Sequence, residues 1–303
     1  MQQIEYNKVG WINSCCPDTR DLLFLKENFH LANAVVQQLP KSIRRPKIEE
    51  YFGYLFLVLH FPVFNHETRL TVPKELDFII TPSAIVTLSQ EKIPQLESFF
   101  EECLRQMVSR EEYFKSAGLL LFFMLDKLVD SCLPMLDHID ENIENIENKT
   151  FSGHEREMLS EIAIVKRDII DFRRTIKPQR SILELLSKKA SAFFDQDLDF
   201  VSQEVIGSNI RVWNTLENHK EMIESIEETN ESLLSYKISD IVKILTVLSS
   251  ITLPLGLVAN IFSMNTALNI TLAQNPLSFW AIIGSMITLS AIMLLYFKKK
   301  KWL

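Results

Sequence analysis

The residues most able to do chemistry share one face of an apolar stretch near the C-terminus. Steps of three or four residues along this stretch select positions that lie on the same side of a helix. Most of the selected residues are polar or small, although the stretch is otherwise rich in leucine, isoleucine and valine. Such a face could line a water-filled pore in which a leucine gates by excluding water. The residues are Ser239, Val242, Thr246, Ser249, Leu253, Gly256, Asn260 and Ser263.

The same pattern also suits helix–helix packing, because small and hydroxyl-bearing residues let membrane helices approach closely. Periodicity alone leaves both interpretations open. Asn260 favours the pore, since a primary amide near the end of a membrane helix gains nothing from contact with lipid. Pro254 lies in mid-stretch, where it removes one backbone hydrogen bond and allows a kink. Because the chain supplies only two such helices, a pore requires several subunits around an axis.

Two apolar stretches, 241–262 and 277–297, are expected to position these side chains as transmembrane helices. Each is just over twenty residues long, and a helix of that length crosses a hydrocarbon core of about 30 Å. Segment 263–276 joins them as a short external loop, and 298–303 forms a basic tail. Trp280 and Tyr296 lie near the ends of the second stretch, as interfacial aromatic residues do.

The distribution of lysines predicts the orientation in the membrane. Lys298–Lys301 directly follow the second stretch and Lys243 lies near the start of the first, whereas 266–276 has no charged residue. By the positive-inside rule, the tail lies in the cytoplasm and the loop faces outward. The N-terminus lacks the basic and apolar regions of a signal peptide. We therefore expect a multi-pass protein of the inner (cytoplasmic) membrane with both termini cytoplasmic.

Residues 1–110 are predicted to form a cytoplasmic α/β domain. Segment 54–61 is a near-continuous apolar run, typical of a buried strand. Segments 76–81 and 84–89 flank Pro82-Ser83 as a hairpin, 68–72 forms a separate short strand, and 95–109 forms a helix.

Residues 111–240 are predicted to form long helices and a stalk. Ser152-Gly153 separates two of the helices, and 155–186 and 197–236 follow as further helices. Without a strong breaker before residue 241, the last one continues into the first transmembrane stretch as a single helix of roughly 60 residues. A helix of that length needs partners along its sides, which a stalk shared between subunits would provide.

Composition and motifs exclude several other classes of protein. The 303 residues carry a net charge of −7, which argues against a nucleic acid partner. The four cysteines lack C-x-x-C spacing and are interpreted as ordinary thiols, and the histidines show no zinc-binding pattern. No glycine-rich phosphate loop or nucleophile motif is present, so we do not expect an enzyme.

The chain resembles the CorA-type magnesium and divalent-cation transporter family. The resemblance runs through most of the chain and is most specific near the C-terminus. There, Met264-Asn265 matches the last two residues of the family's Gly-Met-Asn signature. The other matching segments are Ile244-Leu245-Thr246, Pro254 and the ending Tyr296–Leu303. The resemblance implies an α+β membrane protein with an N-terminal cytoplasmic α/β domain, a long helical stalk and two transmembrane helices per subunit, assembled into a homopentameric funnel.

The resemblance also implies the roles of particular residues in carrying a divalent cation, most simply magnesium. Ser263, Met264 and Asn265 would form the selectivity filter, with five Asn265 amides around the outer mouth. Glu204 falls where the family often has an acidic stalk residue and is a candidate regulatory metal ligand. The cation is substrate and candidate regulator, and no covalent cofactor is expected. A basic ring would comprise Lys243, Lys298, Lys299, Lys300 and Lys301.

Three departures from the family pattern leave alternatives open. Ser263 replaces the glycine of the signature, and its Cβ resists positive φ and close backbone approach. Asn260 replaces another usual glycine, and no acidic residue follows the signature to concentrate cations. The alternatives are a transporter of zinc, cobalt, nickel or another divalent metal on the same fold, and a membrane-anchored scaffold that conducts poorly.

Overall fold

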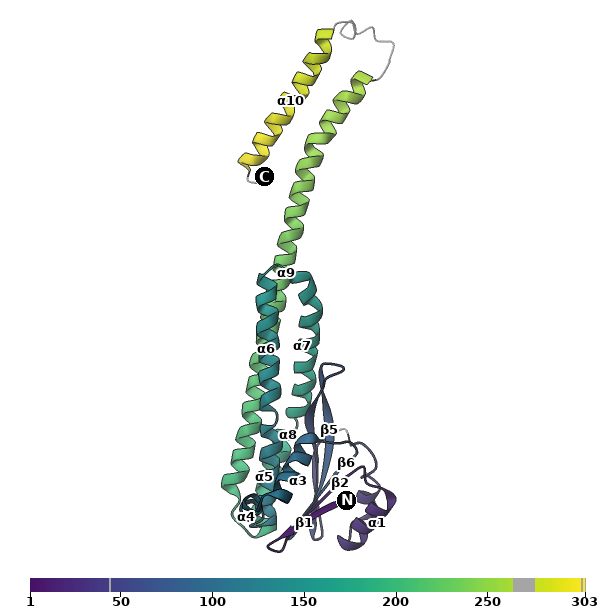
Figure 1. The fold of residues 1–303 in the computed structure, drawn as a ribbon, viewed down its shortest axis with the longest axis vertical. Helices are drawn as coiled ribbons and strands as arrows, with labels where there is room; N and C mark the ends of the chain where they lie inside the picture. Colours follow the sequence, from purple (N-terminus) through teal and green to yellow (C-terminus); the bar gives the residue numbers. More distant parts are fainter. Residues whose placement is uncertain (44, 264–275, 301, 303) are drawn as a thin grey trace. The chain divides into compact units, whose positions relative to one another are not determined.

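The structure, a computed structural model, describes residues 1–43, 45–263, 276–300 and 302, without the side chains of residues 262 and 276–279. The chain divides into two compact units, Met1–Glu228 and Thr229–Leu303. The first unit holds a sheet and most of the helices, and the second holds the apolar helical segments (Figure 1).

The N-terminal unit is built on a six-stranded sheet. Its strand order is β1-β2-β6-β5-β4-β3, in which β2 and β6 are parallel and the other neighbours are antiparallel. The strands are β1 (Gln2–Tyr6), β2 (Val9–Cys15), β3 (Lys47–Tyr51), β4 (Tyr54–Asn65), β5 (Leu70–Ile80) and β6 (Ala84–Ser89).

Helices cover both faces of this sheet, which explains the continuous apolar run in β4. Alternate residues of a strand point to opposite faces. Leu57 and Leu59 belong to a core shared with α3 (Pro94–Arg105) and α5 (Ala117–Asp130). Phe56 and Val58 belong to a second core shared with α1 (Thr19–Asn28) and α2 (Asn33–Val36). The strand predicted at 54–61 is confirmed, and it extends to Asn65.

Long helices follow the sheet along the chain. They are α6 (Leu133–Phe151), α7 (Glu155–Ile176), α8 (Gln179–Phe194) and α9 (Asp199–Ser263), preceded by the short α4 (Met107–Tyr113) and followed by α10 (Pro276–Lys299). Helices α6 and α7 lie side by side, and α7 packs on the β4–β5 hairpin (Figure 1). Arg173 of α7 forms an ion pair with Glu217 of α9 and places its guanidinium 4.9 Å from the ring centroid of Trp213.

The predicted helix boundaries are only partly confirmed by the structure. The break at Ser152-Gly153 is confirmed, since α6 ends at Phe151 and α7 begins at Glu155. The single helix predicted at 155–186 is wrong, because the chain breaks before Pro178, which cannot donate a backbone hydrogen bond and crowds the preceding turn. The helix predicted at 95–109 is divided by Gln106, whose backbone is extended.

The strands predicted separately at 68–72 and 76–81 are one strand, β5. Pro73 lies inside it and stands directly opposite Pro62 of β4. Directly opposite residues in an antiparallel pair either hydrogen-bond to each other or both point their N–H and C=O groups away from the partner strand. Two opposite prolines suit the second kind of pair, because neither needs an N–H toward the other strand. Both prolines also lie beyond the ends of β3 and β6, so no ladder hydrogen bond on the outer side is lost. The prolines therefore do not interrupt the hairpin.

The continuous helix predicted from the stalk into the membrane is confirmed. Helix α9 runs for 65 residues, with Pro254 inside it. Its apolar part and α10 are both long and apolar enough to cross a membrane, and little of either is buried within the chain.

Candidate functional site

The predicted pore-lining residues lie on α9 and are all exposed in the single chain. Leu253 is 71% exposed and Val242 is 54% exposed. Val247, which lies on a different side of the helix, is only 5% exposed. The polar face therefore has no cover within the described part of its own chain. Its other exposed members are Ser239, Thr246, Ser249, Gly256, Asn260 and Ser263.

A hydrogen bond within the helix determines whether a hydroxyl group on this face can act as a donor or only as an acceptor. The Thr246 Oγ1 donates to the backbone carbonyl of Val242, with 2.7 Å between the oxygens. Such a bond satisfies the hydroxyl proton inside the helix. The oxygen keeps its remaining acceptor capacity, which it can present to water or to a hydrated cation.

The middle of this face contains a shallow groove next to Pro254. The groove measures about 490 Å³ and is lined by Leu245, Thr246, Ser249, Ser250, Leu253 and Pro254. One turn further on, a Cβ built on Gly256 would meet no heavy atom within 4 Å. Within the described residues, the space beside Gly256 is therefore open.

The predicted filter is only partly described. Ser263 is the last residue of α9 and is exposed. Met264 and Asn265 lie outside the described residues. The filter therefore stays a prediction from the sequence.

The predicted basic ring includes residues with individual partners. The Lys243 Nζ lies 2.9 Å from the Asp240 Oδ1, so a carboxylate of its own helix partly neutralises it. Lys298 and Lys299 occupy the last turn of α10. The Lys300 Nζ lies 5.6 Å from the ring centroids of both Tyr296 and Trp302. Lys301 lies outside the described residues.

The predicted regulatory residue Glu204 is exposed on α9. It lies near Asp126 of α5, whose pKa is raised by burial and, to a smaller extent, by Asp130 and Glu204. The Ser208 hydroxyl lies 3.4 Å from the Asp126 Oδ1. Within the described ranges, no three His, Cys, Asp or Glu side chains are grouped to hold a metal ion. A regulatory role for Glu204 thus stays a prediction.

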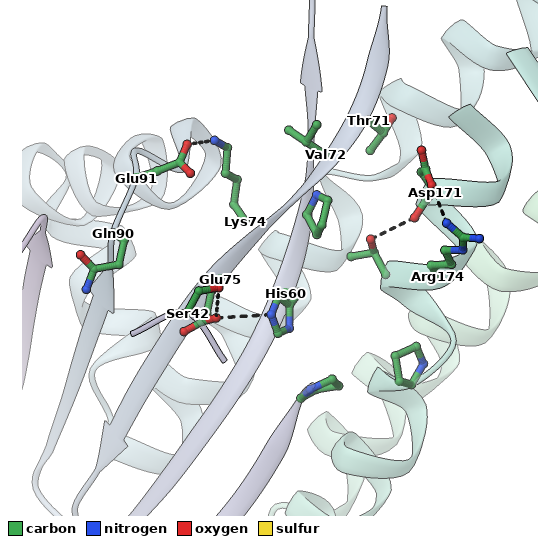
Figure 2. Close-up of a pocket in the computed structure, with 14 residues that line it drawn as sticks. Ser42, His60, Thr71, Val72, Lys74, Glu75, Gln90, Glu91, Asp171 and Arg174 are labelled. Carbon is green, nitrogen blue, oxygen red and sulfur yellow. Dashed lines mark hydrogen bonds and ion pairs between the residues drawn. The ribbon is translucent and has the colours of Figure 1, made fainter. Parts of the chain in front are cut away.

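A pocket lined by several polar side chains lies between the sheet and α7, and no pattern in the sequence points to it (Figure 2). Its volume is about 540 Å³. His60 and Glu75 stand opposite each other on β4 and β5, with 3.5 Å between Nε2 and Oε2. Figure 2 shows these two side chains pointing toward one another, with Asp171 and Arg174 contributed by α7. Only the strand register brings these residues together, so no local pattern in the sequence reveals them.

Glu75 connects this pocket to the segment before β3. Its Oε2 accepts a hydrogen bond from the backbone N–H of Ile43 at 2.5 Å and one from the Ser42 hydroxyl at 3.2 Å. On the same face of β5, Asp77 is only 3% exposed, and its Oδ1 has no hydrogen-bond partner among the described residues. Burial, together with the Glu75 carboxylate, raises the pKa of Asp77 to about 8.

We expect Asp77→Asn to stabilise the protein more at pH 8 than at pH 5. The folded state keeps the Asp77 proton up to about pH 8, whereas the unfolded chain loses it near pH 4. The unfolded state thus gains stability as the pH rises between these values, and the wild type becomes less stable. Since asparagine does not titrate, the gain should be larger at pH 8 by on the order of 2–4 kcal/mol.

Thermal unfolding of the full-length protein in detergent at the two pH values measures this difference. The matched control is Asp137→Asn, which changes an exposed carboxylate on α6. An equal gain from Asp77→Asn at both pH values would contradict the assignment of a buried, protonated Asp77.

Comparison with known proteins identifies the family of this chain. The family model described as CorA-like Mg2+ transporter protein matches residues 6–299. A Thermotoga maritima protein named cobalt/magnesium transport protein CorA is 26% identical over 301 residues, covering 97% of this chain and 83% of that protein.

Two solved structures show the same fold. The complete structure of the CorA magnesium transporter from Methanocaldococcus jannaschii has a TM-score of 0.85 and 20% identity, covering 100% of this chain and 95% of that one. The ZntB cytoplasmic domain from Vibrio parahaemolyticus has a TM-score of 0.57 and 14% identity, covering 75% of this chain and 88% of that one.

Proposed function

This chain belongs to the CorA-like Mg2+ transporter family, and on that premise we propose that it carries divalent cations across the cytoplasmic membrane, with magnesium as the first candidate. It is a membrane protein whose two spans are the apolar part of α9 and α10. The family consists of transporters, and the transported ion is a substrate rather than a resident cofactor.

The polar, exposed face of α9 carries the proposal. In the single chain, hydroxyl and amide groups would face lipid, where polar groups are costly. Surrounding an axis with copies of this helix turns the same groups toward a shared, water-filled path. The open space beside Gly256 supports close approach by a neighbouring subunit.

Five subunits complete the proposed pore. A homopentamer would place five Asn265 amides at the outer mouth, where their oxygens can accept hydrogen bonds from water around the ion. Magnesium gives up its water reluctantly, so a filter that binds the hydrated ion suits it. In the same assembly, Ser263 and Met264 would line the filter next to Asn265, and Leu253 would be the apolar constriction that gates by dewetting.

The proposed orientation places both termini in the cytoplasm. Lys298 and Lys299 lie in the last turn of α10 and Lys300 follows them, so this end of the span would be the inner one. Lysines are retained on the cytoplasmic side of membrane helices, and the uncharged segment 266–276 is translocated readily. These lysines would form the inner basic ring, with Lys243 next to it.

Uptake of magnesium, zinc, cobalt and nickel into proteoliposomes tests this proposal. Uptake of magnesium in preference to the other three ions would support the main proposal. Preference for zinc, cobalt or nickel would identify the alternative transporter on the same fold. A folded oligomer that carries none of the four ions would instead support the poorly conducting scaffold.

We expect Ser263→Gly to raise magnesium uptake. The serine Cβ narrows the mouth and resists the backbone conformations that glycine permits, and five copies would multiply this effect. Uptake rates from liposomes containing equal amounts of each protein provide the measurement. The matched control is Ser250→Gly, which removes a hydroxyl from α9 at a less exposed position. An unchanged or lower rate for Ser263→Gly would contradict the expectation.

A further inference from the structure

Two adjacent cysteines, Cys15 and Cys16, lie where the parallel strands β2 and β6 both end. Cys15 is in register with Ser89, the last residue of β6. The backbone N–H of Cys16 donates to the carbonyl of Ser89 at 2.7 Å. The sheet therefore holds both residues in place. All four cysteines are free thiols, as the sequence indicated, but the sequence did not predict this arrangement of two of them.

The backbone turn at Cys16 brings the two sulfur atoms together. In an extended strand, neighbouring side chains point to opposite faces. Cys16 instead has a φ of +54°, in the left-handed region that residues with a Cβ seldom occupy. The two Sγ atoms lie 3.3 Å apart, and both thiols are free. Strained conformations of this kind are held by the surrounding structure and often accompany function.

The two thiols are accessible. Cys16 is exposed and Cys15 is half-buried. The Cys16 thiol donates to the Gln90 carbonyl at 3.1 Å. Burial, followed by the neighbouring Cys16, raises the pKa of Cys15, so its thiolate is scarce at neutral pH. This accessible pair of adjacent thiols therefore suits a reagent that bonds to two sulfur atoms at once.

The distance between the two sulfur atoms indicates which coordination geometry an atom bound to both of them would have. With metal–sulfur bonds of about 2.3 Å, a linear ion would hold two sulfurs about 4.6 Å apart and a tetrahedral ion about 3.8 Å. A pyramidal centre with bond angles near 90° would hold them about 3.3 Å apart at the same bond length. A disulfide requires about 2.05 Å and would force the intervening peptide to distort. Only the pyramidal centre fits with little movement of the 3.3 Å pair.

We propose that Cys15 and Cys16 form a chelating dithiol site for trivalent arsenic. A trivalent arsenical R–As=O would react with both thiols to give R–As(S–Cys)2 and one molecule of water. Two As–S bonds form, the As=O bond breaks, and the two thiol protons leave with the oxygen. No electrons are transferred, so no oxidant is needed. Among the described residues, no third His, Cys, Asp or Glu completes a metal cluster here, which disfavours zinc.

Phenylarsine oxide binding to the reduced, full-length protein in detergent tests the site. We expect one phenylarsenic group per chain, mapped by mass spectrometry to the peptide that contains both cysteines. A small 1,2-dithiol should remove the group, whereas a monothiol at the same thiol concentration should not. Cys15→Ser and Cys16→Ser should each weaken binding by about 100-fold, because the second thiol of the pair acts at a high effective concentration.

The protein supplies its own controls. Cys103 and Cys132 are fully buried and remain in both serine variants. In Cys15→Ser, the exposed Cys16 should react with a maleimide while the buried Cys103 and Cys132 stay unlabelled, which shows that the variant is folded.

Three outcomes would overturn the proposal. These are full-strength binding by either serine variant, an adduct located on Cys103 or Cys132, and loss of two hydrogens from the Cys15–Cys16 peptide in air without any arsenical adduct. The last would identify a disulfide pair instead. Because binding is measured directly, the result is independent of the proposed ion transport.

Discussion

Asn265→Ala is expected to lower magnesium uptake into proteoliposomes on the order of 10–100-fold, or to abolish discrimination between magnesium and other divalent ions. The substitution would remove five amides at once from the proposed pentamer. Each net hydrogen bond contributes about 1 kcal/mol, and every 1.4 kcal/mol corresponds to about tenfold in binding. Losing two or more such contacts to the hydrated ion therefore accounts for an effect of this size.

The matched control is Asn269→Ala, which removes an amide from the same segment four residues later. The control should keep the wild-type rate and ion preference, because the family resemblance assigns no role to Asn269. If Asn265→Ala kept both as well, Asn265 would be excluded from the filter. Similar losses in the two variants would point to a general requirement for this segment instead of an amide ring.

The second large effect is expected for Gly256→Leu, which should reduce uptake of every ion by at least about tenfold. Gly256 lies on the polar face of α9, one turn beyond Leu253, where a Cβ meets nothing in its own chain. In the proposed assembly, five leucines at this level would fill the path, exclude water or force the helices apart.

Gly284→Leu on α10 is the matched control. A Cβ on Gly284 also meets no heavy atom within 4 Å, so the two substitutions add the same side chain at two equally open positions. We expect Gly284→Leu to retain most uptake, because α10 is the lipid-facing span in the proposed pore. Size-exclusion chromatography should show the same oligomer for both variants. If Gly256→Leu transports as well as Gly284→Leu, the polar face of α9 does not line the path.

Local sequence patterns predicted the membrane helices and the stalk. The two apolar stretches and the absence of a breaker between 197 and 241 correctly indicated α9 and α10. Ser152-Gly153 correctly marked a helix end. These features are set by residues that are close in the sequence: the length of the apolar stretch, its composition and the turn-forming residues at its ends. One amino-acid sequence is therefore sufficient to find them.

Strand boundaries and one helix end were not predictable in the same way. The strands predicted separately at 68–72 and 76–81 are one strand that contains Pro73. Pro73 stands opposite Pro62 across the hairpin, and each proline avoids a lost hydrogen bond only because of that register. Conversely, Pro178 ends α7 although the apolar pattern continues through it. A proline's effect depends on where its missing N–H would have pointed, and that is a property of the paired structure.

Residue patterns in the sequence were enough to locate the membrane spans and the polar face from Ser239 to Ser263, and to indicate the family. The tertiary structure decided which distant residues meet: His60 with Glu75, Asp77 buried beside them, and Cys16 turned back toward Cys15 at the end of β2. The reason is that amphipathic periodicity is a local property. Sheet register and the chain direction at a strand end are fixed by contacts between segments far apart in the sequence.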